Sequence, residues 1–582
     1  MRNSTSMVVR SAFLRLLPAE MISIVVSAIN ALVDSIATGH FLGTGAMAAI
    51  GLFSPVTTVI CLSFVIASGM QILCGQHIGR GEKDQAVSLF SAGIAVLGLY
   101  ALILTVSLLL FLSGLSAALG AREETAQLLS DYMTGYSFGI IGQVFSSTLM
   151  IFLPYNNDER RCYTGIAVMI FSNAAMDLLF TAVLHLGVLG MGLATSISYL
   201  LAGTYMMAGV LRPDKAIRFR LKGLRFSKVG KMIYLGLPEL MFNLGNTVKT
   251  YLINFTVMAA AGEAGMAVMN VQGSVCWIIG AIPQGLGASF IALGSIYYGE
   301  EDRESYTGLL RYSLRIGLIM SAGCTILLMA ASPVIPYLFF PAGNPAFPMA
   351  SAMLLQFSHY LVWDTVFTLL SRAYQCQGRI HFVNVLSLLQ QLLIGLLAFL
   401  GTKLIGISGV WLAFPLTDAV CLAVIGIYAW IKGRKYPETL DAWIQLSPSF
   451  GVSADKVMEF SPKSMEEVVS ISGRITDFCL KKGIDSRKSH MAGLCVEEMA
   501  GNVVAHGFQP GRNHFLDIRV VTDDRIIIRI RDNCREFDPE KRMDQFDPEE
   551  PMKNFAIRMV AGIADEMNYR NDAGINTLLI KC

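Results

Sequence analysis

The strongest constraint on this chain is a series of apolar segments of bilayer length that ends near Lys435. Hydrophobic residues make up 54% of the 582 residues, and charged residues only 15%, whereas about 25% of a soluble protein is charged. A helix of roughly 20 apolar residues crosses the hydrocarbon core of a bilayer. We therefore predict an all-α membrane body with twelve transmembrane helices, at 18–40, 46–74, 88–116, 132–154, 163–185, 188–211, 233–258, 265–292, 310–333, 350–373, 382–404 and 407–431.

Basic residues predict the orientation of these helices. Lys and Arg are concentrated in alternate connections, chiefly 80–83, 160–161, 212–231 and 432–435. The connections between them offer little beyond Arg122 and Lys403. By the positive-inside rule, a multi-pass protein of the plasma membrane with both termini in the cytoplasm is expected. The net charge of +2 is too small to favour a nucleic acid as partner.

The predicted membrane body, residues 1–435, contains an internal repeat. A shift of about 219 residues brings similar segments into register, for example Leu-Pro-Ala-Glu-Met at 17–21 with Leu-Pro-Glu-Leu-Met at 237–241. This shift spans six predicted helices, so the halves, about 10–212 and 230–432, are parallel copies. Such repeats are typical of secondary transporters, which bind substrate between the two bundles. A scaffold or a channel is the alternative.

Polar residues inside the predicted spans indicate where a working site lies, since each is costly in hydrocarbon. The first half contains Asp34, Asn173, Asp177 and Thr195. Asn173 and Asp177 are four residues apart and share one helix face. Two carboxylates with an amide and a hydroxyl form an oxygen-rich set that could bind Na⁺ or hold a proton. An interhelical hydrogen bond is the alternative role for Asp177.

The second half also has polar residues within its predicted spans. Candidates for its cavity are Glu239, Asn246, Lys249 and Asp364, and Asp418 lies in the last span. Lys249 could pair with one of the carboxylates, and it would add positive charge to this half.

Several motifs of residues 10–432 resemble the multidrug and toxic compound extrusion (MATE) family. They are Val33-Asp34, the Gly- and Ala-rich run at 42–51, Gly75-Gln76 with Gly79-Arg80-Gly81, Asn173-Ala-Ala-Met-Asp177, and Gly190 with Ala194-Thr195. The resemblance implies export of small organic, often cationic compounds by alternating access, driven by inward H⁺ or Na⁺. It also implies that Asp34, Asn173, Asp177 and Thr195 form the cation site of the first half.

After a linker at 436–449, residues 450–582 have the pattern of a water-soluble α+β domain with two layers. The expected strands are 457–460, 514–521, 525–531, 566–570 and 575–581, and the expected helices are 463–482, 486–506 and 553–564. About 130 residues suffice for one hydrophobic core.

One predicted helix of this domain has a polar stripe. Glu498, Asn502 and His506 follow at intervals of four residues. The amide oxygen of an asparagine can ligate Mg²⁺ between phosphates, and a carboxylate one turn earlier can orient a water or act as a base. A solvated helix face is the common alternative, but a strand that ends at Asp532 follows and favours a nucleotide site.

That order of elements resembles the GHKL-type ATPase fold, in particular the anti-sigma-factor serine kinases. The resemblance implies that Glu498 is the catalytic or water-positioning carboxylate, Asn502 the Mg²⁺ ligand, and Asp532 the acceptor for the adenine amino group. Two family glycine motifs are replaced, one by Asp532-Asn-Cys-Arg-Glu536 and one by the segment from Lys553 to Arg558. Side chains there restrict the approach of backbone amides to phosphates, although Lys553 and Arg558 could compensate by charge.

The sequence thus predicts a cation-coupled exporter with a cytosolic domain that binds Mg-ATP or a regulatory protein. Weak protein kinase activity of this domain is a further possibility. The alternative is a membrane-anchored sensor whose C-terminal domain is the output, as a protein-serine kinase or as a binder of a regulatory protein. An ATP-driven pump is disfavoured because the chain has no Gly-x4-Gly-Lys-Ser/Thr loop.

Overall fold

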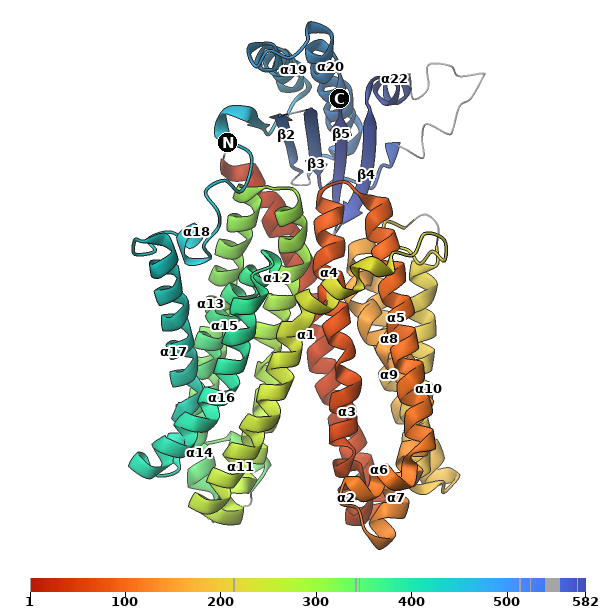
Figure 1. Ribbon diagram of the computed structural model, residues 1–582, viewed down its shortest axis with the longest axis vertical. Helices are drawn as coiled ribbons and strands as arrows, with labels where there is room; N and C mark the ends of the chain where they lie inside the picture. Colours follow the sequence, from red (N-terminus) through yellow and green to blue (C-terminus); the bar gives the residue numbers. More distant parts are fainter. Residues whose placement is uncertain are drawn as a thin grey trace.

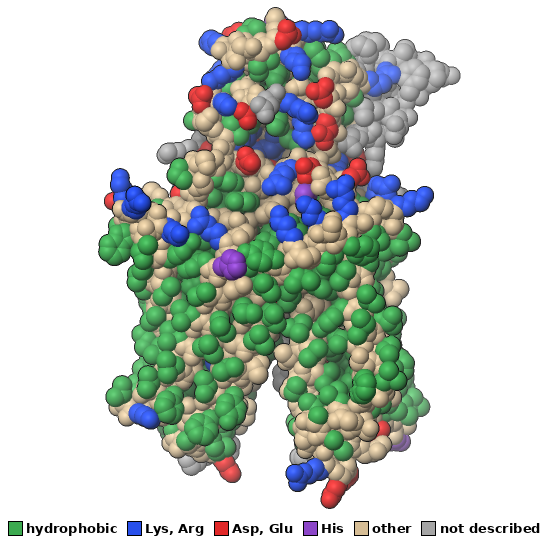
Figure 2. Space-filling view, in the orientation of Figure 1, with side chains coloured by type: hydrophobic (Ala, Val, Ile, Leu, Met, Phe, Trp, Pro, Cys, Tyr) green, Lys and Arg blue, Asp and Glu red, His purple; other side chains and the backbone are tan. Residues whose placement is uncertain are grey.

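The computed structural model describes residues 2–212, 215–340, 343–344, 346–511, 514–523, 525–539, 555–572 and 574–582. A long helical body carries a small domain with a β-sheet at one end (Figure 1). The two halves of the body lie together at this end, which we call the domain-bearing end. They separate at the opposite end, which we call the open end (Figure 2).

In the first half, red to yellow in Figure 1, the regular secondary structure of the described residues is helical. Its α-helices are α1 (Arg2–Phe41), α2 (Gly43–Leu52), α3 (Ser54–Cys61), α4 (Ser63–Gly79), α5 (Lys83–Leu110), α6 (Leu112–Ala118), α7 (Glu123–Ser137), α8 (Ile140–Phe152), α9 (Glu159–Asp177) and α10 (Gly187–Val210). Two short turns, η1 (Leu153–Asn156) and the π-helical η2 (Leu178–Val183), extend α8 and α9.

The second half begins after a basic connection and is also helical in its described residues. It comprises η3 (Phe226–Lys228), α11 (Val229–Ile279), α12 (Ala281–Gly299), α13 (Arg303–Ala331), η4 (Ile335–Leu338), α14 (Ala346–Phe357), α15 (Tyr360–Cys376), α16 (Ile380–Ile405) and α17 (Ser408–Gly433). Within α11, Gly262 has φ 58° and ψ −148°, so α11 is two helices that meet at a kink. Glycine adopts this conformation without the steric cost of a side chain.

The predicted number of twelve membrane helices is not confirmed. Among the described residues, eight helical segments are long and apolar enough to span a bilayer, or nine if the pair α7 and α8, bent by 54°, counts as one span. The predicted ranges do lie in helical segments. The number differs because the helices on either side of the Gly262 kink count as one segment of 74 residues, Phe226–Gly299, because α14 and α15 are each too short to cross alone, and because α1 is not among the segments counted.

Glycines allow the two halves to approach closely at the domain-bearing end, where α4 packs against α11 and α12. A Cβ on Gly69 would lie 1.7 Å from the carbonyl oxygen of Met232, and a Cβ on Gly236 would lie 1.7 Å from that of Val65. No larger residue fits at either position without moving a helix.

Polar side chains add hydrogen bonds across the same contact. Gln76 of the first half donates to the carbonyl oxygen of Cys376 at 3.0 Å, and Tyr155 donates to that of Ala292 at 3.2 Å. All four residues are buried. The domain-bearing end of the body is therefore closed by packed and hydrogen-bonded helices.

The C-terminal domain has the expected α+β organisation, with a five-stranded sheet in the order β1-β2-β3-β5-β4 and all neighbours antiparallel. Its elements are η5 (Ala454–Lys456), β1 (Val457–Phe460), α19 (Met465–Lys481), α20 (Ser486–Asn502), η6 (Val503–Gly507), β2 (Leu516–Thr522), β3 (Ile526–Asp532), α22 (Phe555–Ile563), β4 (Glu566–Asp572) and β5 (Ile575–Lys581).

The two faces of this sheet differ in chemistry. Side chains alternate along a strand, so Ile528 and Ile530 of β3 join Val468 and Val496 of the helices in the core of the domain. The opposite face carries charged residues, and it lies against the domain-bearing end of the body (Figure 1).

A connector joins body and domain, and it is bound to the second half. It contains α18 (Leu440–Trp443). Tyr374 donates to the carbonyl oxygen of Trp443 at 2.6 Å, and Arg379 donates to that of Gln445 at 2.6 Å. Phe450 stacks on Tyr298 with ring centroids 4.7 Å apart.

Candidate ion, substrate and nucleotide sites

The predicted polar residues of the first half come from helices that pack together. Asp34 lies on α1, Asn173 and Asp177 on α9, and Thr195 on α10. Asn173 and Asp177 are 0% and 1% exposed. The carboxyl groups of Asp34 and Asp177 lie against each other, and the phenol of Tyr132 is close to both.

Several polar atoms at this position lack the partners that buried groups usually have. Both amide atoms of Asn173 and both carboxylate oxygens of Asp177 are without a hydrogen bond of normal geometry in the described part of the chain. Two carboxyl groups in contact require a proton or a cation between them. With the Asn173 amide oxygen they form the kind of oxygen set that Na⁺ prefers.

Local backbone structure also marks Asp177. It is the last residue of α9, where the helix widens into the π-helix η2, and π-helical turns occur frequently at functional sites. Thr195 donates to the carbonyl oxygen of Met191 on its own helix at 3.1 Å. Spacing in the sequence does not reveal the π-helix or the approach of Tyr132.

In the second half, Gln390 of α16 connects two buried carboxylates. Its Nε2 donates to Asp418 Oδ1 at 2.7 Å and to Asp364 Oδ1 at 3.2 Å. Gln391 donates to Gln390 Oε1 at 3.2 Å. Lys249 of α11 lies near both carboxylates. We call Lys249, Asp364, Gln390, Gln391 and Asp418 the second-half cluster. The sequence analysis did not single out the two glutamines, although two adjacent polar residues inside an apolar helix could have indicated them.

The other two candidates of this half have different surroundings. Glu239 forms an ion pair with Arg372 of α15, with 2.5 Å between Oε1 and Nη1, and Arg372 also donates to Gln375 Oε1 at 2.8 Å. Glu239 therefore holds α11 against α15. Asn246 is half-buried on α11, one turn before Lys249.

In the C-terminal domain, the predicted nucleotide residues come from α20 and from two elements that pack against it, β3 and α22. Glu498 and Asn502 are half-buried on α20, Asp532 ends β3, and Arg558 lies on α22. Lys553 lies outside the described residues. A carboxylate and an amide one turn apart on a helix face fit a Mg²⁺-bound phosphate group.

Asp532 is oriented by a network within the domain. Its Oδ1 accepts from the backbone N–H of Cys534 at 2.8 Å and from Asn576 Nδ2 at 2.7 Å. Tyr569 donates to Asn576 Oδ1 at 2.6 Å. Burial raises the pKa of Asp532 above its usual value. No pattern in the sequence indicates Asn576 as a partner of Asp532.

Cys534, which stands where the resembling family has glycine, packs against the end of η6. A Cβ on Gly507 would lie 3.0 Å from Cys534 Sγ. Burial raises the pKa of Cys534 to about 12, so its thiol is neutral at physiological pH. His514, 3.6 Å from the same sulfur, stacks on Phe508 with centroids 5.4 Å apart.

This fold and these sites define a multi-pass membrane transporter with an ATPase-like domain. The chain belongs to the MatE family, whose model matches residues 18–183 and 238–400, more than half of its length. Residues 461–582 match the histidine kinase-like ATPase domain.

Relatives and solved structures agree with this assignment. The chain is 23% identical over 456 residues to the "Probable multidrug resistance protein YoeA" of Bacillus subtilis (strain 168), covering 75% of this chain and 96% of the relative. It is 25% identical over 433 residues to the "FAD transporter" of Shewanella oneidensis, covering 69% and 89%. The structure described as "Crystal structure of MATE in complex with MaL6" has a TM-score of 0.68 and 21% identity, and covers 74% of this chain and 97% of that one.

Proposed function

We propose that this protein exports small organic compounds, drug-like compounds among them, by alternating access, driven by Na⁺ or H⁺ that enters through the first half. The contact between the carboxyl groups of Asp34 and Asp177 carries this proposal. Asn173, buried beside Asp177 on α9, supplies the amide, and Thr195 completes the set. The multidrug names of relatives support the substrate class.

The proposed orientation places both termini and the C-terminal domain in the cytoplasm. Lys and Arg side chains gather where the body meets the domain, and few lie at the open end (Figure 2). This distribution is what the positive-inside rule requires. The open end then faces outward.

The second-half cluster supports a substrate range wider than cations. Lys249 brings a positive charge to Asp364 and Asp418, so this side of the protein offers hydrogen-bond donors as well as acceptors. A relative named as an FAD transporter is consistent with substrates that carry anionic groups.

The proposed division of the chain is a transporter at 1–435, a linker at 436–449 and a regulatory domain at 450–582. In that domain Asn502 would hold Mg²⁺, Asp532 the adenine amino group, and Arg558 with Lys553 the phosphates. Bound Mg-ATP would supply the polyanion that these residues contact. The helix side of the sheet, away from the body, is where a regulatory protein would also bind.

The first test is transport by Asp177→Asn and Asp34→Asn in proteoliposomes with an imposed Na⁺ or H⁺ gradient. Each removes one carboxylate from the pair, so gradient-driven export should fall by at least about tenfold while the protein remains folded. Glu263→Gln, at an exposed position, is the matched control and should transport normally. Wild-type export by both aspartate variants would refute the site.

A further inference from the structure

The charged face of the C-terminal sheet is buried against the body. Arg519 of β2 and Arg529 of β3 are paired directly opposite each other, an arrangement that is destabilising for like charges. Asp302, between α12 and α13, resolves it, because its Oδ2 lies 3.0 Å from Arg519 Nη1 and 2.7 Å from Arg529 Nη1. A carboxylate of the body therefore relieves the repulsion between two arginines of the sheet.

Glu300 supplies a second carboxylate to the same face. It is 2.7 Å from Arg529 Nη1 and also accepts hydrogen bonds from Arg531 and Arg570. The four arginines are between 2% and 8% exposed. Buried charges of this kind are stable only when they are paired. Glu300 and Asp302, with Asp517 and Glu459 of the sheet, provide these pairs. The second half thus holds the domain by an ion network.

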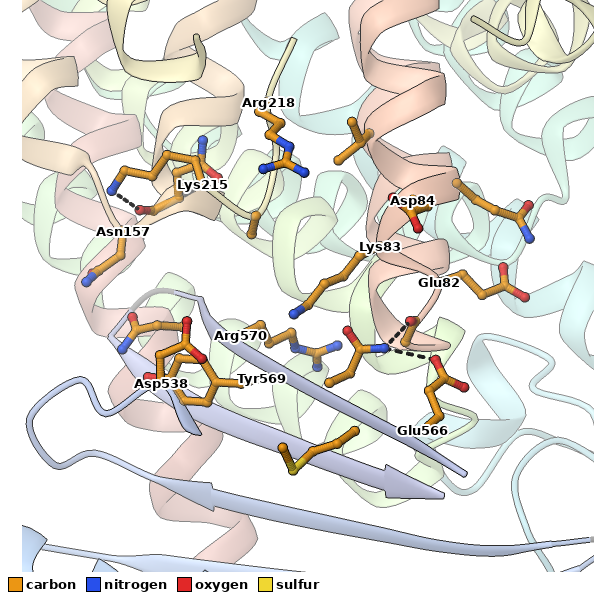
Figure 3. A pocket seen from close by; sticks show the side chains of 18 of the residues that line it. Glu82, Lys83, Asp84, Asn157, Lys215, Arg218, Asp538, Glu566, Tyr569 and Arg570 are labelled. Atoms are coloured by element: carbon orange, nitrogen blue, oxygen red, sulfur yellow. Dashed lines mark hydrogen bonds between the residues drawn. The ribbon is translucent and has the colours of Figure 1, made fainter. Parts of the chain in front are cut away.

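Strand β4 also reaches the first half. Arg570 Nη1 donates to the carbonyl oxygen of Ile78, and Asn568 Nδ2 donates to that of Gly81 at 2.9 Å. Figure 3 shows Arg570 and Glu566 of β4 opposite Glu82 and Lys83 at the start of α5. One side chain, Arg570, thereby binds a carbonyl of the first half and a carboxylate of the second.

The two attachment points adjoin each other because the domain-bearing end is closed. A Cβ on Gly79 would lie 2.2 Å from the carbonyl oxygen of Ile296 and 2.9 Å from the backbone nitrogen of Glu300. Opening this end requires α4 to leave α12, and residues 78–81 would then move away from Glu300. Strand β4 cannot remain bound to both segments during that movement.

We propose that the docked C-terminal domain is a clamp that keeps the transporter closed at the domain-bearing end and must release residues 78–81 before that end can open. The clamp gives the proposed regulatory domain its mode of action, and it rests on the proposed function for its effect on transport. Release occurs at the first half, where β4 is held by the hydrogen bonds to Ile78 and Gly81 beside a cavity of about 660 Å³. On the side of the second half, Glu300 and Asp302 pair with four arginines of the sheet. Strand β4 follows α22, which carries Arg558 of the proposed nucleotide site.

Two measurements on the full-length protein in lipid nanodiscs test the clamp, with no substrate or ion gradient. Hydrogen exchange of β4 and of residues 299–305 reports docking. Alkylation of the native Cys376 by a water-soluble maleimide, followed by mass spectrometry, reports opening, since Cys376 is 0% exposed at the contact between the halves.

In Arg570→Gln both exchange and Cys376 alkylation should increase by at least roughly tenfold, because Glu300 loses one partner and Ile78 is released. Lys456→Gln, at an exposed ion pair on the same domain, is the control and should behave as wild type. Glu300→Gln removes a carboxylate that the second half contributes to the ion network. This variant tests the clamp if Arg570→Gln does not fold.

Faster hydrogen exchange with unchanged alkylation of Cys376 would refute the clamp, since the domain would then undock without opening the domain-bearing end. Unchanged exchange in both variants would overturn it as well. Absence of transport by the wild type would refute the proposed export function, but hydrogen exchange and Cys376 alkylation would still test the clamp. Failure of the one proposal can therefore be told from failure of the other.

Discussion

At the scale of residues, Glu300 shows how the ion network depends on pH. Burial alone would raise its pKa, but Arg531, Arg529 and Arg570 outweigh burial and lower the pKa from 4.5 to about 2. Burial likewise opposes the effect of Arg519, Arg529 and Arg531 on Asp302, whose pKa nevertheless lies far below its usual value. Both carboxylates remain charged throughout the physiological range.

The folded pKa of Glu300 lies below the unfolded one, so the stability it contributes is complete above pH 4.5 and is lost as the pH falls toward 2. Glu300→Gln should therefore cost about 3–5 kcal/mol at neutral pH. The difference in thermal unfolding temperature between wild type and Glu300→Gln should be constant from pH 8 to pH 5 and shrink below pH 4.5. A difference that disappears near pH 6 would contradict this assignment.

Asn502 is the residue on which nucleotide binding depends in our proposal. Asn502→Ala removes the amide oxygen for Mg²⁺, and Mg-ATP affinity should fall by at least about tenfold, the value of one good ligand interaction. Titration calorimetry on the full-length protein measures this, with Gln509→Ala, exposed beyond η6, as control. Equal affinity of both variants would leave Asn502 without a role in binding.

Where a polar side chain interrupts an apolar helix, as for Asp34, Asn173 and Asp177, the sequence indicates which residues to consider, and the structure places them on helices that pack together. Their role as an ion site stays a prediction. Residue chemistry could not be predicted where partners come from distant segments. The alternation of Ile and Arg in β3 indicates one polar face of a strand, but no local pattern shows that Glu300, more than 200 residues earlier, covers that face. Glu239 was placed among cavity residues for the same reason, because its partner Arg372 lies on another helix.

At the scale of elements, the strands and helices of the C-terminal domain agree closely with their predicted ranges, since each has a clear period and clear ends. The membrane helices agree in position, but their number does not follow from hydropathy. The kink at Gly262 in α11 falls between the predicted spans 233–258 and 265–292, whereas the bend between α7 and α8 lies inside the predicted span 132–154. Apolar composition does not record that bend, which is set by packing and backbone geometry.

The glycine contacts of α4 with α11 lead to a prediction at this scale. Gly236→Ala places a Cβ 1.7 Å from the carbonyl oxygen of Val65, so the closed domain-bearing end should lose about 1–3 kcal/mol. Alkylation of Cys376 should increase accordingly. Gly230→Ala, on the same helix with no atom within 4 Å, is the matched control. Equal alkylation in the two variants would show that this contact does not control opening.

At the scale of the whole molecule, the domain should regulate transport without being required for it. A chain that ends at Gly451 keeps the connector and the stacking of Phe450 on Tyr298. In proteoliposomes, this truncation should retain gradient-driven export, and its Cys376 alkylation should match that of Arg570→Gln. A truncated protein that is folded but inactive in export would show that the domain is part of the transport machinery itself.

The connector divides the protein into a part that stays fixed and a part that moves. Trp443, Gln445 and Phe450 bind the connector to the second half, and Glu300 and Asp302 bind the sheet to it. The second half and the domain would therefore behave as one rigid body. The first half, which contains the Asp34–Asp177 pair, would be the part that moves. The proposed ion site would then change position, while the C-terminal domain stays bound to the second half.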